Sequence, residues 1–156
     1  MDIYDELRCL VGTLDDVGLD YAVCGGLAVG FHGYPRFTED IDLMIAEEDL
    51  DQFLNHARNL GFTIDAGRMI FNKDTDRETV IHRVTKIHDG DHLILDILVE
   101  NETLKPIWNL RDVLDWRGQR ITIVSREGLA RLKRNSGRDQ DLLDLKKLGL
   151  LDESPS

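Results

Sequence analysis

The stretch YAVCGGLAVGFHGYPRFTEDIDLMI, residues 21–45, contains two adjacent glycines and, after a spacer of 13 residues, two aspartates one residue apart. Residues 21–24 form a short apolar run that predicts a buried strand, and residues 27–31 suit a short helix. The strand stops at Gly25 and Gly26, so the helix opens directly from these glycines. Free backbone N–H groups and the helix dipole favour an anion at such a start, although a Gly-Gly pair alone is more often a tight turn.

The two aspartates lie in a segment with two-residue periodicity. Ile41 and Leu43 point to one side, whereas Asp40 and Asp42 point to the other. The two carboxylates therefore leave the same face of the strand roughly 6–7 Å apart, and they repel each other unless a cation or solvent intervenes. A solvated strand face and a metal site both fit this pair on its own.

The remaining chain alternates between helical and strand patterns. The expected helices cover residues 2–17, 47–60, 125–132 and 139–148, and the expected strands cover residues 62–64, 69–71, 80–87, 93–99 and a hairpin over 112–124. This order predicts a mixed β-sheet flanked by helices, in the α/β or α+β class. We expect one domain over residues 1–150 and a disordered tail over 151–156.

Composition places the chain among globular proteins and leaves its partner open. The net charge is −11, yet residues 111–147 carry 10 Lys and Arg against 6 Asp and Glu. The acidic remainder argues against long-range capture of nucleic acid without excluding a local contact. No apolar run approaches the roughly 20 residues of a membrane span. Cys9 and Cys24 give no disulfide framework, so we interpret both as small core residues of a cytoplasmic protein.

A third carboxylate, Asp96, interrupts the apolar strand HLILDILVE. An acid among so many aliphatic residues is costly to bury unless it is paired or bound to a cation. A salt bridge to an arginine from elsewhere would satisfy it, and so would a metal ion. Three carboxylates near a phosphate-cradling turn are the site expected for oxygen-ligated Mg²⁺ that holds a polyphosphate.

The residues quoted so far resemble the signature of the nucleotidyltransferase superfamily, the DNA polymerase beta-like enzymes. That signature is a hydrophobic strand, Gly-Gly or Gly-Ser, a spacer, and then two aspartates that alternate with hydrophobic residues. The form found here looks most like the minimal nucleotidyltransferases and the AbiEii-type toxins. The segment SREGLARLKRNSGRDQDLLDLKKLG resembles their late motif, in which Lys133, Arg138 and Asp141 are the matching residues. The resemblance implies the nucleotidyltransferase fold with a short C-terminal helical segment.

The resemblance also implies how the donor nucleotide would be bound. Gly25 and Gly26 would hold the phosphates of an NTP through their backbone amides, and Lys133 and Arg138 are candidates to bind the triphosphate. Arg36 is a further phosphate candidate, unless it pairs with a neighbouring carboxylate.

Chemistry would take place at the carboxylates. By the same resemblance, Asp40 and Asp42 would ligate Mg²⁺, with two ions expected, and Asp96 would complete the metal site and help to deprotonate the acceptor hydroxyl. Attack on the α-phosphate would then release pyrophosphate.

The acceptor is left open among RNA ends, a partner protein and a small molecule. A protein acceptor would suit a toxin-antitoxin pair, and a small cationic antibiotic of the lincosamide or aminoglycoside type would suit an acidic cleft. A non-catalytic nucleotide-binding or regulatory domain of the same fold is the remaining alternative. Because little chain is left for a separate substrate domain, we expect the specificity to come from loops, from a homodimer partner or from another protein.

Overall fold

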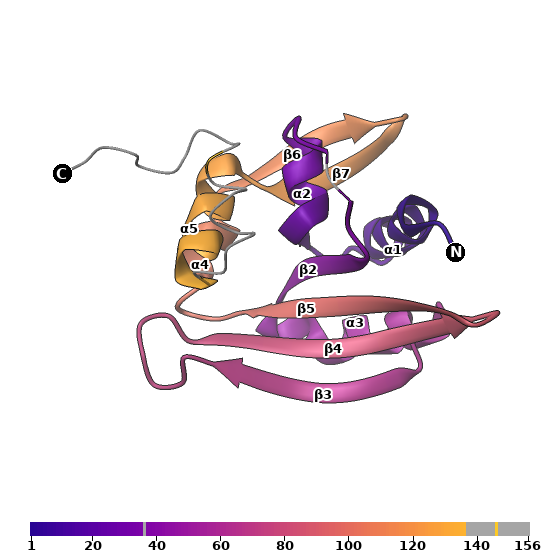
Figure 1. Cartoon of the computed structure of the whole chain (residues 1–156), viewed down its shortest axis with the longest axis horizontal. Coiled ribbons are helices and arrows are strands. Elements are labelled where there is room, and N and C mark those ends of the chain that lie inside the picture. Colours follow the sequence, from indigo (N-terminus) through magenta and orange to yellow (C-terminus); the bar gives the residue numbers. More distant parts are fainter. Residues whose placement is uncertain (36, 137–145, 147–156) are drawn as a thin grey trace.

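The computed structural model describes residues 1–35, 37–136 and 146, and its strands form one seven-stranded mixed sheet in the order β3-β4-β5-β2-β1-β7-β6 (Figure 1). The strands are β1 (Ala22–Cys24), β2 (Asp40–Ala46), β3 (Ile64–Phe71), β4 (Thr79–His88), β5 (Asp91–Glu100), β6 (Arg111–Trp116) and β7 (Gln119–Val124). The helices are α1 (Ile3–Val17), α2 (Gly25–Phe31), α3 (Leu50–Asn59), α4 (Lys105–Trp108) and α5 (Arg126–Ser136). The predicted fold class, a mixed sheet with helices packed on it, is confirmed.

Two of the strand pairings are parallel and cross long stretches of sequence. β2 pairs with β5, and β1 pairs with β7, in parallel, whereas the other pairings in the sheet are antiparallel. In Figure 1, β3, β4 and β5 run side by side with α3 behind them, and α2 and α5 stand on the other side of β5. The sheet thereby brings the start of α2, the middle of β5 and α5 around the end of β1.

Helix α1 shows why the local sequence folds as expected. The Asp2 side chain accepts hydrogen bonds from the backbone N–H groups of Tyr4 (2.8 Å) and Asp5 (3.2 Å), which satisfies two donors of the first turn. Gly18 ends the helix in the left-handed conformation, with φ of 73°. The helical stripe Leu7, Leu10, Val11 and Leu14 is buried and forms part of the hydrophobic core.

Strand β2 has the predicted alternation. Ile41 and Leu43 are fully buried at 0% exposure, whereas Asp40 and Asp42 on the opposite side keep contact with solvent. α1 and α3 contact each other and β2. The acidic side of β2 is therefore the side available for chemistry.

Some boundaries differ from the sequence expectations. In place of the expected strands 62–64 and 69–71 the structure has one strand, β3, which begins at Ile64 and continues to Phe71 through a register irregularity between Asp65 and Gly67. The Asp65 carboxylate accepts the Gly67 N–H at 2.7 Å, and Gly67 has φ of 82°. The first turn of the expected helix 47–60 is a 3₁₀ turn, Glu47–Asp49. Helix α4, a single turn, is too short for periodicity to predict.

The interpretation of both cysteines as core residues is wrong for Cys9. Cys24 is buried at 1% exposure, but Cys9 is exposed. Cys9 lies two residues after Leu7, and two residues turn a helix by about 200°, so Cys9 faces away from the apolar stripe of α1. The expected helix over 139–148 and the expected tail over 151–156 fall outside the described residues, apart from residue 146. Among the described helices, none is long and apolar enough to cross a membrane.

Candidate active site

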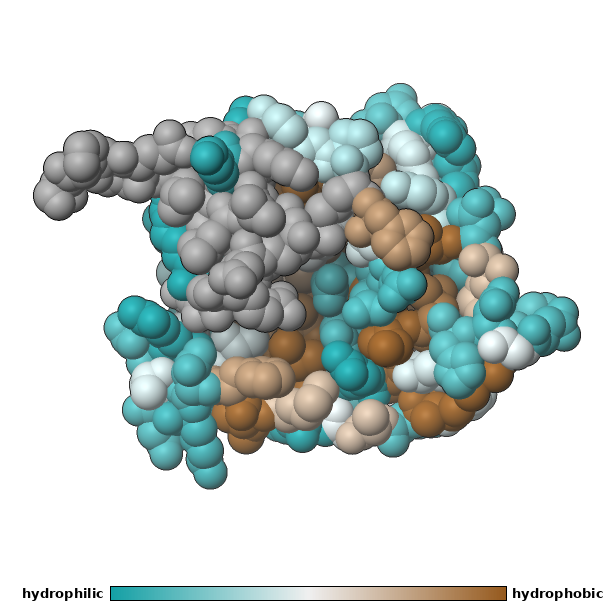
Figure 2. All heavy atoms as spheres, in the orientation of Figure 1, coloured by the Kyte–Doolittle hydropathy of each residue, from teal (hydrophilic) through white to brown (hydrophobic). Residues whose placement is uncertain are grey.

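A cavity of about 660 Å³ lies between the acidic side of the sheet and α5. Figure 2 shows polar and apolar side chains next to each other in the hollow at the centre of this face. The cavity contains every predicted site residue that the structure describes, namely Gly25, Gly26, Asp40, Asp42, Asp96 and Lys133. The two other predicted phosphate ligands, Arg36 and Arg138, lie outside the described residues.

The floor of the cavity is a row of side chains on four neighbouring strands. Cys24 of β1 is opposite Asp42 of β2, Asp42 is opposite Asp96 of β5, and Asp96 is opposite Arg83 of β4. Neighbouring strands are about 4.8 Å apart, so the row brings the carboxylates of Asp42 and Asp96 close together although they are far apart in sequence. Asp40 is two residues before Asp42 on the same side of β2, as predicted.

Asp96 is paired with Arg83, one of the two arrangements that the sequence left open. The Arg83 guanidinium donates from Nε to Oδ1 at 2.8 Å and from Nη2 to Oδ2 at 3.1 Å. The side chain of Asp96 is 11% exposed and that of Arg83 is 39% exposed, so a nearly buried carboxylate is paired with a guanidinium that keeps contact with solvent. The hydrogen bonds and charge of Asp96 raise the pKa of the Arg83 guanidinium above its usual value.

Sequence reasoning missed Arg83, although a signal for it was present. A tight turn at Asp89 and Gly90 pairs His88 with Asp91. Counting back along both strands from this turn places Arg83 opposite Asp96. The register of the β4–β5 hairpin therefore predicts Arg83 as the partner of Asp96.

Burial and neighbouring acids affect Asp40. Partial burial is the main cause that raises the pKa of the Asp40 carboxyl above its usual value, and the charges of Asp96 and Glu39 add to it, while Arg83 opposes the shift. The charges of Asp96 and Glu39 therefore add to the effect of burial in disfavouring the charged form of Asp40. A bound cation would relieve this repulsion.

The glycine turn approaches the acidic pair closely. Gly25 has φ of 65°, a conformation that side chains rarely adopt, and a Cβ atom at Gly25 would overlap the Asp42 carboxylate. Helix α2 begins at Gly25, and the side chain of Cys24, the residue before the helix, makes no hydrogen bond to the first backbone amides. The sequence needs glycine here because the turn and the carboxylate share the same space.

Lys133 completes the opposite wall of the cavity. The helix that carries it, α5, begins after Ser125, whose Oγ accepts the Gly128 N–H at 3.0 Å, as the side chain of an N-cap residue does. Lys133 is only 4% exposed. Burial raises the pKa of the Cys24 thiol well above its usual value, as do the charges of Asp42 and Asp96, while the charge of Lys133 opposes the shift. This opposition places Lys133 within electrostatic reach of the floor.

The chemistry of the donor set fits a hard divalent cation. Asp40, Asp42 and Asp96 offer carboxylate oxygens, the ligands that Mg²⁺ prefers, from one side of two adjacent strands. Within the described ranges, no three His, Cys, Asp or Glu side chains already lie in an arrangement that could hold a metal ion. Arg83 donates one hydrogen bond to each oxygen of Asp96, so Asp96 has fewer acceptor positions left for a cation than a carboxylate without such a partner.

Comparison with known proteins gives a family for this arrangement. The family model described as aminoglycoside-2''-adenylyltransferase matches residues 6–148, which is nearly the whole chain and includes every candidate site residue. The chain belongs to the aminoglycoside-2''-adenylyltransferase family. This membership confirms the predicted nucleotidyltransferase superfamily and an enzyme of the nucleotidyltransferase class, whereas the finer resemblance to AbiEii-type toxins stays a prediction.

Solved structures share the fold at low identity. A Thermotoga maritima protein assigned as a nucleotidyltransferase has a TM-score of 0.58 at 18% identity, over 90% of this chain and 88% of its own. ANT(2'')-Ia in complex with adenylyl-2''-tobramycin has a TM-score of 0.57 at 11% identity, over 91% of this chain and 84% of its own. A Helicobacter pylori protein assigned as a nucleotidyltransferase has a TM-score of 0.52 at 21% identity, over 93% of this chain and 65% of its own. No curated protein matches the sequence significantly.

Proposed function

We propose that the chain transfers a nucleoside monophosphate, AMP, from ATP to a hydroxyl group of an aminoglycoside-type acceptor with the help of Mg²⁺. The observation that carries the proposal is the cavity in which Asp40, Asp42 and Asp96 face the Gly25 turn and the buried Lys133. Carboxylates that hold a cation on one side of a phosphate, and amides and a lysine on the other, are the groups that nucleotidyl transfer requires.

The residues have separate roles in the transfer. The backbone amides at the start of α2 and the Lys133 ammonium bind the triphosphate, while Asp40 and Asp42 hold the cation. Mg²⁺, when bound, neutralises charge on the phosphate oxygens. The acceptor oxygen attacks the α-phosphorus, the bond to pyrophosphate breaks, and the hydroxyl proton passes to a carboxylate. Asp96 is the proposed proton acceptor, since a carboxylate has about four acceptor positions and Arg83 uses two of them.

The nature of the acceptor follows from the charge of the cavity. The segment 38–40 contributes Glu39 and Asp40 to one end of the cavity, and this acidic end attracts cations. Aminoglycosides carry several amino groups, which are protonated at neutral pH, beside the hydroxyl groups that could be adenylylated. The family match and the complex of ANT(2'')-Ia with adenylyl-2''-tobramycin support the same class of acceptor.

The direct test uses tobramycin as the acceptor. The chain is incubated with ATP labelled at the α-phosphate, Mg²⁺ and tobramycin, and the products are separated by mass. We expect adenylylated tobramycin and an equal amount of pyrophosphate, and we expect both to be lost in Asp42→Asn. The matched control, Asp51→Asn, changes an exposed aspartate on α3 far from the cavity and should leave the rate unchanged.

The other acceptors are outcomes of the same assay when a cell lysate replaces tobramycin. Label in a protein would support the toxin-antitoxin alternative, and label in RNA would support a nucleic-acid acceptor; either result would overturn the aminoglycoside assignment. A chain that binds ATP but forms no product with either acceptor source would instead favour the regulatory domain. Size-exclusion chromatography with light scattering would test the expected homodimer or partner complex.

A further inference from the structure

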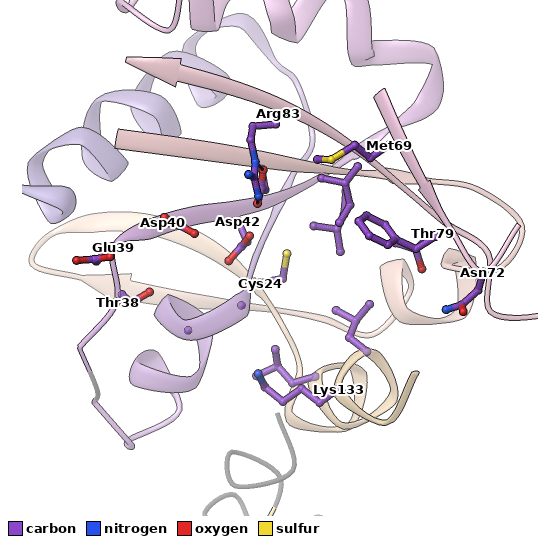
Figure 3. Close-up of a pocket in the computed structure, with 18 of the residues that line it drawn as sticks. Cys24, Thr38, Glu39, Asp40, Asp42, Met69, Asn72, Thr79, Arg83 and Lys133 are labelled. Carbon is purple, nitrogen blue, oxygen red and sulfur yellow. Dashed lines mark hydrogen bonds and ion pairs between the residues drawn. The ribbon is translucent and has the colours of Figure 1, made fainter. Parts of the chain in front are cut away.

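The cavity changes from acidic to apolar along the strands of the sheet. Residues 38–40 form the acidic end, and Figure 3 shows them on one side of Asp42 and Arg83, with Met69 and Thr79 on the other. The apolar end consists of Met69, Phe71, Ile81, Leu98, Leu129 and Leu132. Such different ends suit two different chemical groups, one on each side of the carboxylate row.

The apolar end starts close to the reacting centre. Leu98 is opposite Ile81, and Ile81 is opposite Met69, in a row two residues further along the strands than Asp96 and Arg83. Because a strand rises about 3.3 Å per residue, the two rows are about 7 Å apart. The ribose of a nucleotide bridges a comparable length between its α-phosphate and its base.

The positions of the lysine and leucine side chains on α5 indicate which substrate lies at the apolar end. Leu129, Leu132 and Lys133 line the cavity from neighbouring positions of one helical face. A molecule whose anionic part contacts Lys133 therefore has its neutral part beside the two leucines. The acidic end attracts a cationic acceptor, so the donor, whose phosphates contact Lys133 and the cation, is the substrate that extends toward the leucines.

The far edge of the apolar end carries two polar side chains. Asn72 follows Phe71, and Thr79 is the cross-strand partner of Phe71. The Asn72 amide can both donate and accept hydrogen bonds, and the Thr79 hydroxyl donates to the backbone oxygen of Arg77 at 3.2 Å, which leaves its lone pairs as acceptors. Apolar walls with polar groups at the rim suit a flat heterocycle, which has apolar faces and a polar edge.

We propose that the apolar end binds the base of the donor nucleotide, with Phe71 against the face of its ring and Asn72 at its polar edge. This assignment rests on the proposed nucleotidyl transfer and adds the residues that recognise the base. It predicts that base and phosphates are bound by separate groups, so that each can be weakened without the other.

Neighbouring residues of β3 provide a matched pair of variants. Phe71 and Ile70 are 47% and 46% exposed, but they point to opposite sides of the strand, and only Phe71 lines the cavity. Calorimetry with Mg²⁺ measures the Kd of ATP and of inorganic tripolyphosphate, which has no base. In Phe71→Ala we expect the Kd of ATP to rise about 5- to 100-fold, the range for loss of one base-aromatic contact, and that of tripolyphosphate to stay unchanged. Ile70→Ala should change neither.

A second variant tests the edge contact in a loop position where folding is less at risk. Asn72 has φ of 53°, so Asn72→Gly removes the amide and keeps the backbone conformation. It should weaken binding of ATP and leave that of tripolyphosphate unchanged. Circular dichroism of each variant establishes that it is folded.

The possible negative results distinguish an error in the proposed base site from an error in the proposed function. If wild-type protein binds tripolyphosphate as tightly as ATP, or if Phe71→Ala weakens both alike, the base site is refuted and the transferase proposal stands. If Phe71→Ala weakens tobramycin binding instead of ATP binding, the apolar end belongs to the acceptor and the assignment is refuted as well. Wild-type protein that binds neither phosphate compound would refute the proposed function, and the base site with it.

Discussion

Replacement of Arg83 by glutamine should destabilise the protein and change its response to Mg²⁺. The substitution removes the guanidinium that donates to both oxygens of Asp96, at 2.8 and 3.1 Å, and leaves a side chain that can donate to only one of them. The Asp96 carboxylate, 11% exposed, would keep its charge in a buried position with an uncharged partner. Both the lost hydrogen bond and the uncompensated charge lower the stability of the folded state.

The magnitude lies between two known limits. Breaking a fully buried ion pair costs about 3–5 kcal/mol, whereas exposed pairs contribute roughly 0–1 kcal/mol. Asp96 is near the first limit, but the Arg83 side chain is 39% exposed, so water replaces part of what is lost. We expect the free energy of unfolding to fall by about 2 kcal/mol, which corresponds to a Tm lowered by about 4–8 °C for a chain of this size.

The assay is urea unfolding of wild-type protein, Arg83→Gln, Asp96→Asn and the double variant. The double-mutant cycle isolates the interaction between the two side chains. Arg68→Gln is the control, because Arg68 is an exposed arginine of the same hairpin outside the cavity, and its loss should change stability by less than about 0.5 kcal/mol. Since Asp96 is released in Arg83→Gln, Mg²⁺ should raise the Tm of this variant more than that of the wild type.

Two results would refute this reasoning. A coupling free energy near zero in the cycle would mean that the ion pair does not stabilise the fold. An equal Tm increase with Mg²⁺ in wild-type protein and Arg83→Gln would mean that Arg83 and the cation do not compete for Asp96.

Two further predictions concern the glycine turn and the acidic pair. Gly25→Ala should lose roughly 2–3 kcal/mol of stability in chemical unfolding, because its Cβ would overlap the Asp42 carboxylate in a strained conformation. The control is Gly18→Ala, at a residue with φ of 73° and no atom within 4 Å of an added Cβ, which should lose about 1 kcal/mol. Equal losses in the two variants would contradict the overlap. Burial raises the pKa of Asp40 above 3.8, so the folded state holds that proton more tightly than the unfolded state, and the stability contribution of Asp40 falls as pH rises through this range. Asp40→Asn should therefore be more stable than wild-type protein near pH 7, by less than about 1 kcal/mol after solvent screening, and should show no such gain below pH 3.8; unfolding at both pH values measures the difference.

The parts of the site fixed by local sequence could be predicted. The direction of Asp40 and Asp42 follows from the two-residue period of one strand, and the helix start at Gly25 follows from the glycines at the end of an apolar run. Both features depend on residues within a few positions of one another. Local sequence alone therefore located the acidic side of β2 and the glycine turn at the start of α2.

The features of the site that depend on how distant segments of the chain pack together could not be predicted from local sequence. For Asp96, the sequence left an arginine and a cation as alternatives, because the choice depends on which strand lies beside β5 and in which register. The burial of Lys133 depends on where α5 packs against the sheet, and its place in the site came from a resemblance to known enzymes. The prediction that Cys9 is a core residue was wrong for a different reason. It rested on composition, whereas the helical period of α1 places Cys9 away from the buried stripe.

The parallel pairing of β2 with β5 also determines when the cavity floor can form during synthesis. Asp42 and Asp96 can become neighbours only after the residues between them have been synthesised, and Lys133 is synthesised later still. Pairings between strands so far apart in sequence form slowly, because the chain loses loop-closure entropy before the contacts between the strands contribute any stabilisation. A nascent chain that ends before β5 has the glycine turn and the acidic pair but lacks the floor of the cavity. If a nucleotide binds at the proposed site, its binding would therefore report that the sheet is complete, and the bound nucleotide would stabilise the whole fold instead of one segment.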